Sequence, residues 1–297
     1  VVWVSKGSDS NALYKIKIRE RSTLGIWSDP QVLYEGANLV AFPEIAMNDS
    51  GHIFVAWQQL DSDVFTVYSC WRDNSTSDWG DVVPLSDGST HAGLVKVAID
   101  DVLNGIAVWR QADTPVVGSE LALSGHLVAR SVTAPNITSP ITQLSSFGED
   151  AFHTSIVTHR SNVVLSNDGM GAVAWSGFDG EDFRIYVVQR TSDLEWTEST
   201  PVSMVGQHAK MPSLTQGNNG ALAVSWQRSD GQYSRIQASF WDPTTSIWSQ
   251  PKSISDAGQS AFWSTMSWDG TDTYSAFWSR NDGQYYRLES REAQVLP

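Results

Sequence analysis

The sequence predicts an all-β fold, a β-propeller built from four-stranded antiparallel blades. The first observation behind this is a polar turn with glycine that runs into a short β-prone segment ending in tryptophan, as in 217–226. This pattern is typical of a tight hairpin. Five passages carry it in full and the chain opens on its second half. The tryptophans are spaced by 54, 52, 66, 51 and 52 residues: Trp3, Trp57, Trp109, Trp175, Trp226 and Trp278.

Self-similarity at a period near 52 indicates a propeller or a solenoid. A second tryptophan repeats on the same cycle, 24, 22, 21 and 22 residues after the first, and a proline follows it within a few residues. Large aromatic side chains of this kind pack between neighbouring sheets. The residues of this second series are Trp27, Trp79, Trp196 and Trp248.

We expect one propeller domain over residues 1–297, because radially repeated β proteins fold as one unit with a distributed core. Six blades are expected, with five or seven as alternatives. The first repeat lacks its first strand, and the last stops before its fourth unless 294–296 forms a shortened one. The expected repeats are about 1–36, 37–88, 89–148, 149–206, 207–258 and 259–297.

Alternating apolar and polar residues place the individual strands. The second repeat is complete and serves as the reference for the others. Its four strands are expected at 43–47, 53–59, 65–71 and 82–86.

Composition disfavours several classes of function. The net charge is −14 with only 19 Lys and Arg, so a duplex-binding surface, which needs a dense basic patch, is disfavoured. No apolar run is long enough to span a bilayer. The single cysteine, Cys70, can form no intramolecular disulfide. Because the chain starts midway through a repeat, we expect a removed leading segment and a secreted or cell-surface protein.

A repeated aspartate lies four residues after the tryptophan, in the expected hairpin between strands two and three. In three repeats an arginine follows nine residues after the tryptophan. Two interpretations stay open: cross-strand ion pairs beside a glycine turn, or polar sites that hold sugar hydroxyls with Tyr233 or Tyr285 as an aromatic platform. The three complete pairs are Asp179 with Arg184, Asp230 with Arg235, and Asp282 with Arg287; Asp61 and Asp113 occupy the same position.

The linkers that enter the first strands contain two histidines, His91 and His208. In a four-stranded blade these linkers emerge on the same face as the hairpins between strands two and three, and function in rigid scaffolds usually lies in such loops. The histidines either line the mouth of an axial channel or serve as plain hydrogen-bonding groups. No set of metal ligands accompanies them, so no metal or other cofactor is expected.

The one long interval, 66 residues, results from two insertions. One lengthens the hairpin at 114–121 and the other lengthens the linker at 152–160. Both should rise from the same face. We expect a partner-binding ridge there, with His153, His159 and Arg160 as its polar groups, or else a tolerated surface insertion.

The turn-plus-tryptophan repeat and the segment from tryptophan to proline resemble the exported bacterial β-propellers, sialidase-like and lectin-like in fold. In the first repeat, 7–9, 11–14 and Trp27 also resemble tectonin-type lectin repeats. The sialidase Asp box and arginine triad are not evident in this sequence. The resemblance therefore implies the architecture and gives little support for sialidase chemistry.

From these observations we expect a non-enzymatic module that binds a glycan or a protein through the face of the hairpins and linkers. One alternative is a glycoside hydrolase or sialidase-like enzyme with an axial site, which needs two opposed carboxylates. Glu44, Glu149 and Asp150 are the candidates for that pair. The other alternative is a structural platform for protein interactions.

Overall fold

The computed structural model is all-β and describes residues 1–9, 11–76, 78–113, 125–133, 137–146, 162–206, 208–217, 220–270 and 273–294. The described residues form strands, turns and bends, with no helix among them. The chain divides into two compact units, Val1–Gly148 and Glu149–Pro297. That boundary coincides with the expected end of the third repeat. Each unit is described by itself.

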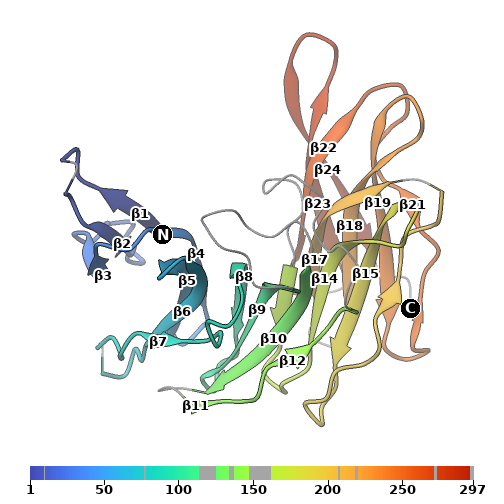
Figure 1. Ribbon diagram of the computed structural model, residues 1–297. Coiled ribbons are helices and arrows are strands. Elements are labelled where there is room, and N and C mark those ends of the chain that lie inside the picture. The colour runs from blue at the N-terminus through green and yellow to red at the C-terminus, as the bar shows by residue number, and fades with distance from the viewer. Residues whose placement is uncertain are drawn as a thin grey trace. The chain divides into compact units, whose positions relative to one another are not determined.

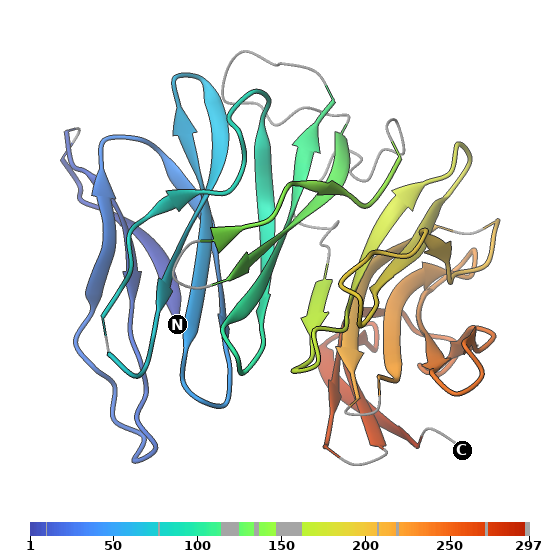
Figure 2. The ribbon, with the colours of Figure 1, turned by 90° about the horizontal axis from the view of Figure 1, so that it is seen from below.

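The first unit contains three antiparallel sheets, ordered β1-β2-β3 (sheet 1), β4-β5-β6-β7 (sheet 2) and β8-β9-β10-β11 with β12 also on β10 (sheet 3). Sheet 2 lies between the other two, since β4 contacts β1 and β8 (Figures 1 and 2). The strands are β1 Val2–Lys6, β2 Tyr14–Ile18, β3 Gln31–Gly36, β4 Val40–Met47, β5 Ile53–Asp61, β6 Val64–Arg72, β7 Val83–Pro84, β8 Ala92–Ile99, β9 Asn104–Ala112, β10 Gly125–Thr133, β11 Ile137–Thr138 and β12 Thr142–Gln143.

The second unit repeats the plan with sheet 4 (β13-β14-β15-β16), sheet 5 (β17-β18-β19-β20, with β21 also on β19) and sheet 6 (β22-β23-β24). Sheet 5 lies between its neighbours, because β17 contacts both β14 and β22. The strands are β13 Asn162–Leu165, β14 Gly171–Phe178, β15 Phe183–Arg190, β16 Thr200–Pro201, β17 Ala209–Gln216, β18 Leu222–Ser229, β19 Ser234–Asp242, β20 Ile247–Trp248, β21 Lys252–Ser253, β22 Ala261–Trp268, β23 Thr273–Asn281 and β24 Tyr286–Gln294.

These sheets confirm the expected all-β, blade-like architecture. The fourth strands of sheets 2 to 5 are shorter than expected, with two residues each, and each contains or closely follows a proline, which cannot donate to the ladder: Pro84, Pro140, Pro201 and Pro251. In sheet 1, β3 follows Pro30 and still runs for six residues. Of the segment 294–296, which could have formed a shortened fourth strand of sheet 6, Gln294 alone lies within the described residues. It pairs with Thr273 and extends the third strand.

Four of the repeat tryptophans, in β5, β9, β18 and β23, lie in the second strands and fill the space between sheets, whereas Trp3 in β1 is only partly buried. Trp57 packs with Ile16 and Ile18 of sheet 1. Trp109 packs in one cluster with Phe54 and Trp71 of sheet 2. Trp226 and Trp278 meet sheets 4 and 5 in the same way. Burying such a ring stabilises each sheet-to-sheet contact by several kcal/mol, on the order of 25 cal/mol per Å² of apolar surface.

Each short fourth strand is followed by a buried serine that attaches it to the third strand. The serine hydroxyl accepts a hydrogen bond from a backbone N–H of the third strand, at 2.8–3.0 Å. The preceding apolar residue donates its own N–H to the third strand's carbonyl. The four serines are Ser86, Ser145, Ser203 and Ser255.

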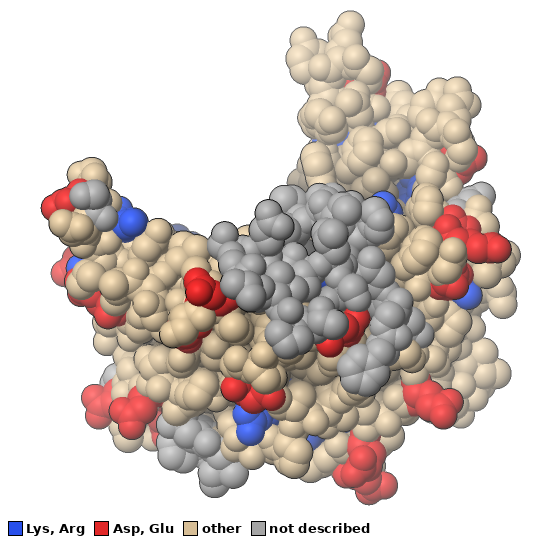
Figure 3. Space-filling model, viewed as in Figure 1, with Lys and Arg blue, Asp and Glu red and all other residues tan. Residues whose placement is uncertain are grey.

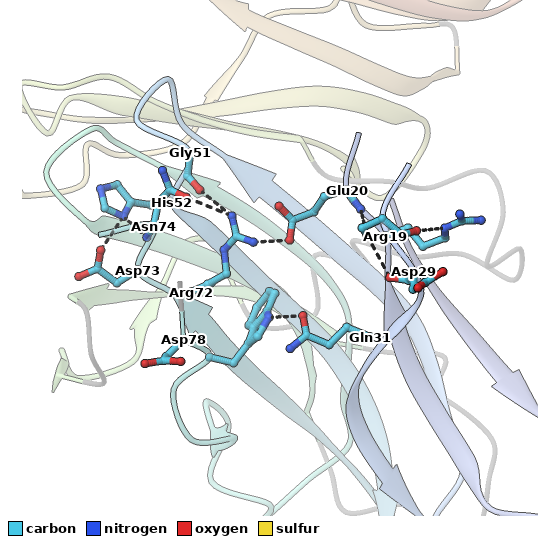
Figure 4. Close-up of polar contacts among 12 residues, drawn as sticks. Arg19, Glu20, Asp29, Gln31, Gly51, His52, Arg72, Asp73, Asn74 and Asp78 are labelled. Atoms are coloured by element: carbon cyan, nitrogen blue, oxygen red, sulfur yellow. Dashed lines mark hydrogen bonds and ion pairs between the residues drawn. The ribbon is translucent and has the colours of Figure 1, made fainter. Parts of the chain in front are cut away.

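Polar contacts also join sheets 1 and 2 at the end where β6 finishes (Figure 4). The half-buried Arg72 donates to the carboxylate of Glu20 in sheet 1 and contacts the carbonyl of Gly51 at 3.5 Å. Nearby, Trp79 Nε1 donates to Gln31 Oε1 at 3.0 Å. The guanidinium of Arg72 thus links the two sheets, and its role is structural.

Replacing Trp226 by alanine should lower the free energy of unfolding by about 3–5 kcal/mol, because the ring is fully buried between sheets 4 and 5. Urea unfolding followed by circular dichroism measures this loss. Trp27, which is 44% exposed, is the control, and its alanine variant should lose about 1 kcal/mol or less. Equal losses in the two variants would contradict the packing role.

Candidate functional site

The end of a sheet that carries the hairpin between strands two and three is here called the hairpin–linker end, because in sheets 2, 3 and 6 the linker into the first strand meets the hairpin there. Backbone hydrogen bonds show this directly. Ala112 N donates to His91 O at 2.8 Å, and Asn281 N donates to Ser260 O at 2.9 Å. The expectation that these two kinds of loop share a face is confirmed for these sheets.

The repeated aspartates close the hairpin turns. Oδ1 of Asp230 accepts the backbone N–H groups of Gln232 and Tyr233, at 3.0 and 2.7 Å. Asp179 and Asp282 make the same two bonds in their own turns. Backbone N–H donation is the largest cause of the lowered carboxyl pKa in all three. The following glycines have φ of 103°, 95° and 97°, a left-handed conformation that other residues adopt with strain: Gly180, Gly231 and Gly283.

The arginines of these hairpins have different partners in different sheets. Arg184 and Arg235 each donate to the carbonyl of the attaching serine, Ser203 or Ser255, at 2.6 Å. Arg235 also lies 3.5 Å from Asp230. The described residues of sheet 6 include no fourth strand. There Arg287 Nε instead pairs with Asp282 Oδ2 at 2.7 Å, and its side chain is 67% exposed.

The two tyrosines of the expected sugar platform also differ. Tyr233 is half-buried, and its hydroxyl accepts a hydrogen bond from Gln232 at 3.3 Å. Tyr285 is exposed at the tip of the β23–β24 hairpin. Of these two tyrosines, Tyr285 alone has a ring that is exposed to solvent.

The linker histidines cap the third strand of the preceding sheet. Nδ1 of His91 accepts the backbone N–H of Phe65 at 3.0 Å, and Nδ1 of His208 accepts that of Phe183 at 3.2 Å. Ser260 makes the equivalent bond to Ser234 N with its hydroxyl. His91 is 2% exposed. These contacts favour the hydrogen-bonding interpretation over a role at a channel mouth, and the ligand-binding role stays a prediction.

His153, His159 and Arg160 lie outside the described residues, as do both insertions and the candidate carboxylates Glu149 and Asp150. The third candidate, Glu44, is ion-paired with Lys96 on the neighbouring first strand. The described residues contain no group of three or more His, Cys, Asp or Glu that could hold a metal ion. In the same part of the chain, no helix could cross a membrane.

Sheet 3 contains a pair that the sequence reasoning missed. Nδ1 of His126 lies 2.7 Å from Oδ1 of Asp113, and both side chains are largely buried. The strand register identifies the repeat position of this histidine. His126 lies opposite Gln111, which is two residues after Trp109, and Arg287 lies opposite Arg280, which is two residues after Trp278. His126 therefore occupies the position of the hairpin arginines, with Asp113 as the repeated aspartate. The insertion after Asp113 hid the equivalence, because it places His126 seventeen residues after Trp109 instead of nine.

A second feature that the sequence reasoning missed is a group of three aromatic rings in sheet 6, formed by Phe262, Trp263 and Tyr286. Among these, Trp263 and Tyr286 are both exposed.

On the face drawn in Figure 3, Asp and Glu side chains form separate groups and Lys and Arg are sparse. This agrees with the net charge of −14.

No protein-family model matches the chain, and no curated protein matches it. Solved structures do match. A protein of unknown function from Dyadobacter fermentans DSM 18053 has a TM-score of 0.58 at 9% identity, over 87% of this chain and 79% of that one. The leech intramolecular trans-sialidase has a TM-score of 0.52 at 9% identity, over 97% of this chain and 64% of that one. A polysaccharide lyase, an ulvan lyase, has 0.51 at 9% identity, over 88% and 74%.

At such identities the likeness shows the fold alone, which is all-β and sialidase-like. The hydrazine synthase of Kuenenia stuttgartiensis shares it too, with a TM-score of 0.53 at 11% identity, over 93% of this chain and 75% of that one. One architecture thus carries unrelated activities, and function has to be argued from the site.

The carboxyl group of Asp230 should titrate below the ordinary aspartate value of about 3.9, because two backbone N–H groups hold its charged form. With the folded pKa below the unfolded one, its contribution to stability is present above the unfolded pKa. It is lost as the pH falls through the folded pKa. Carbon-13 NMR titration measures this, with Asp230→Asn identifying the signal. Titration at or above the ordinary value would contradict the turn geometry.

Proposed function

We propose that this protein cleaves a carbohydrate, with the Asp113–His126 pair of sheet 3 as its proton-transfer group. The fold supports this, because the trans-sialidase and the ulvan lyase that share it both act on glycans. The proposal includes six blades in one propeller, one for each sheet. An extracellular polysaccharide as substrate fits a secreted or cell-surface protein.

The observation that carries the proposal is the replacement of arginine by histidine at one repeat position. Sheets 4, 5 and 6 place a permanently charged guanidinium there, as Arg184, Arg235 and Arg287. Histidine is the side chain whose ordinary pKa lies closest to neutrality, so it can both take and give a proton. The change falls in the hairpin that also carries the insertion, where the repeat symmetry is broken.

The geometry of the pair suits acid–base chemistry. A carboxylate at 2.7 Å from Nδ1 orients the imidazole ring, and proton transfer to or from a substrate would proceed through Nε2. Elimination needs such a base to remove a proton next to a uronate carboxylate. Hydrolysis needs an acid that protonates the glycosidic oxygen. The two reactions differ in product, since only elimination creates a carbon–carbon double bond.

Plain glycan binding without cleavage is the second candidate. It is favoured by the exposed aromatic group of sheet 6.

Replacing His126 by glutamine should lower the rate of cleavage about 10²–10⁴-fold, the usual contribution of a general acid or base. The substrates tested are ulvan, a sialylated oligosaccharide and neutral arabinan. Cleavage is measured as the release of reducing ends and as the ultraviolet absorbance of a new double bond. The matched control is His52→Gln. His52 pairs with Asp73 at 3.2 Å, at the opposite end of sheet 2, so this variant should keep full activity.

Two results would contradict the proposal. One is a wild-type protein that cleaves no member of a broad panel of neutral and uronate-containing polysaccharides. The other is a His126→Gln variant as active as wild type. In the first case binding alone would remain as the function.

A further inference from the structure

Lys210 in β17 is a half-buried cation without a carboxylate partner. Its ammonium lies 4.5 Å from the centroid of the buried Phe183 ring of sheet 4. Within the part of the chain that the structure describes, this ammonium forms no ion pair and no hydrogen bond. Burial lowers the pKa of the lysine, and no neighbouring carboxylate offsets the shift. The positive charge is therefore partly desolvated and uncompensated, and an anion that reached it would compensate it.

His208 supplies a hydrogen-bond donor two residues before this lysine. Its Nδ1 accepts the backbone N–H of Phe183 at 3.2 Å, as His91 accepts that of Phe65. An acceptor Nδ1 carries no proton, so the proton of the neutral ring is on Nε2. The carboxylate of Asp182 lies 3.4 Å from the same Nδ1 and leaves Nε2 unopposed. With the Nδ1 edge held against β15, the 51% exposed side chain presents Nε2–H to solvent.

The fold brings these two donors to one place. Phe183 is the first residue of β15, directly after the hairpin of sheet 4, and its ring centroid lies 5.8 Å from that of His208. Lys210 pairs with Gln227 near the end of β18. Since β15 and β17 are in contact, both donors lie around one buried ring, where the hairpin–linker ends of sheets 4 and 5 meet.

This combination is specific to sheet 5. The first strands with a bulge, β4, β8, β17 and β22, each contain a left-handed residue: Phe42, Leu94, Met211 and Trp263. The bulge thus belongs to the architecture. The residue before it is Ala41, Gly93 or Phe262 in the other three strands, and β17 alone has a cation there. The other linker histidine, His91, is buried together with its Nε2.

We propose that His208 and Lys210 bind the anionic group of an acidic sugar, either a uronate carboxylate or a sulfate ester. One ammonium and one neutral N–H match a group with a single negative charge and several acceptor oxygens. A nucleic acid needs a denser basic patch than this chain of net charge −14 offers. A neutral sugar would leave the ammonium uncompensated. The inference rests on the proposed carbohydrate function and deepens it, because it names an acidic glycan as the substrate class.

The test measures binding separately from cleavage, by affinity electrophoresis in native gels. The probes are polygalacturonate, which carries carboxylates, carrageenan, which carries sulfates, and neutral arabinan. At least one acidic polymer should retard the wild-type protein. Lys210→Met keeps the apolar stem over Phe183 and should weaken that binding by about tenfold or more, the usual loss of a charged hydrogen bond. Lys210→Arg should retain most of it, and His208→Ala should weaken it by a smaller factor.

Lys252→Met is the matched control. It removes the same charge from an exposed position of the same sheet, in β21, and should bind as wild type does. Equal weakening in Lys210→Met and Lys252→Met would show a general effect of net charge and would overturn the inference. Unchanged thermal unfolding of Lys210→Met excludes a folding defect, and His208→Ala tests the site with a second variant.

The outcomes distinguish this inference from the proposed enzyme. If the protein cleaves a glycan but neither acidic polymer retards it, the anion site is overturned and the enzyme stands. If retardation depends on Lys210 but no polysaccharide is cleaved, the enzyme is overturned and the anion site stands. If Lys210→Met raises KM for an acidic polysaccharide and leaves kcat unchanged, both are supported. Retardation that depends on Lys210 with one acidic polymer alone supports the site and identifies its ligand as the carboxylate or the sulfate.

Discussion

Burial of a tryptophan in the second strand of each of sheets 2 to 6 is the constraint on which the rest of the structure depends. In sheets 2, 3, 5 and 6 the ring reaches the sheet before it in the chain, as Trp57 reaches Ile16 and Trp226 reaches the residues of β14 and β15. A β-strand places alternate residues on opposite faces. The position of this ring therefore determines which face of each strand is buried and which residues arrive at the two ends of the sheet.

The hairpin–linker end is consequently built from equivalent positions that carry different side chains. The aspartate four residues after the tryptophan closes a turn in sheets 4, 5 and 6. A second equivalent position lies on the third strand, opposite the residue that comes two places after the tryptophan. In sheets 4 and 5 it holds an arginine that attaches the fourth strand. In sheet 6 it holds an exposed arginine, and in sheet 3 a histidine. Function on this scaffold can arise by substitution at a fixed position of the strand register.

Most of the fold could be predicted from the sequence, because hydrophobic alternation and tryptophan spacing report burial directly. The third strand of sheet 2, expected at 65–71, forms over Val64–Arg72. The bulges could not be predicted, because residue propensities do not indicate that Trp263 adopts a left-handed backbone conformation. The shortness of the fourth strands in sheets 2 to 5 could not be predicted from their prolines alone, because β3 follows Pro30 and is six residues long.

The candidate site was less predictable. The hairpin aspartates and arginines were found by their spacing, but a spacing cannot separate a turn-closing carboxylate from one that binds a ligand. The Asp113–His126 pair escaped because an insertion separates its members in sequence, while the β9–β10 register brings them together. Long-range register is a property of the folded sheet and is not encoded in any short motif.

The most direct test of this account is a crystal structure of the protein with an oligosaccharide obtained from the glycan that the protein binds or cleaves. The account predicts sugar density at the hairpin–linker end, beside His126 or beside His208 and Lys210. Density confined to the opposite end of the sheets, near the His52–Asp73 pair, would contradict it.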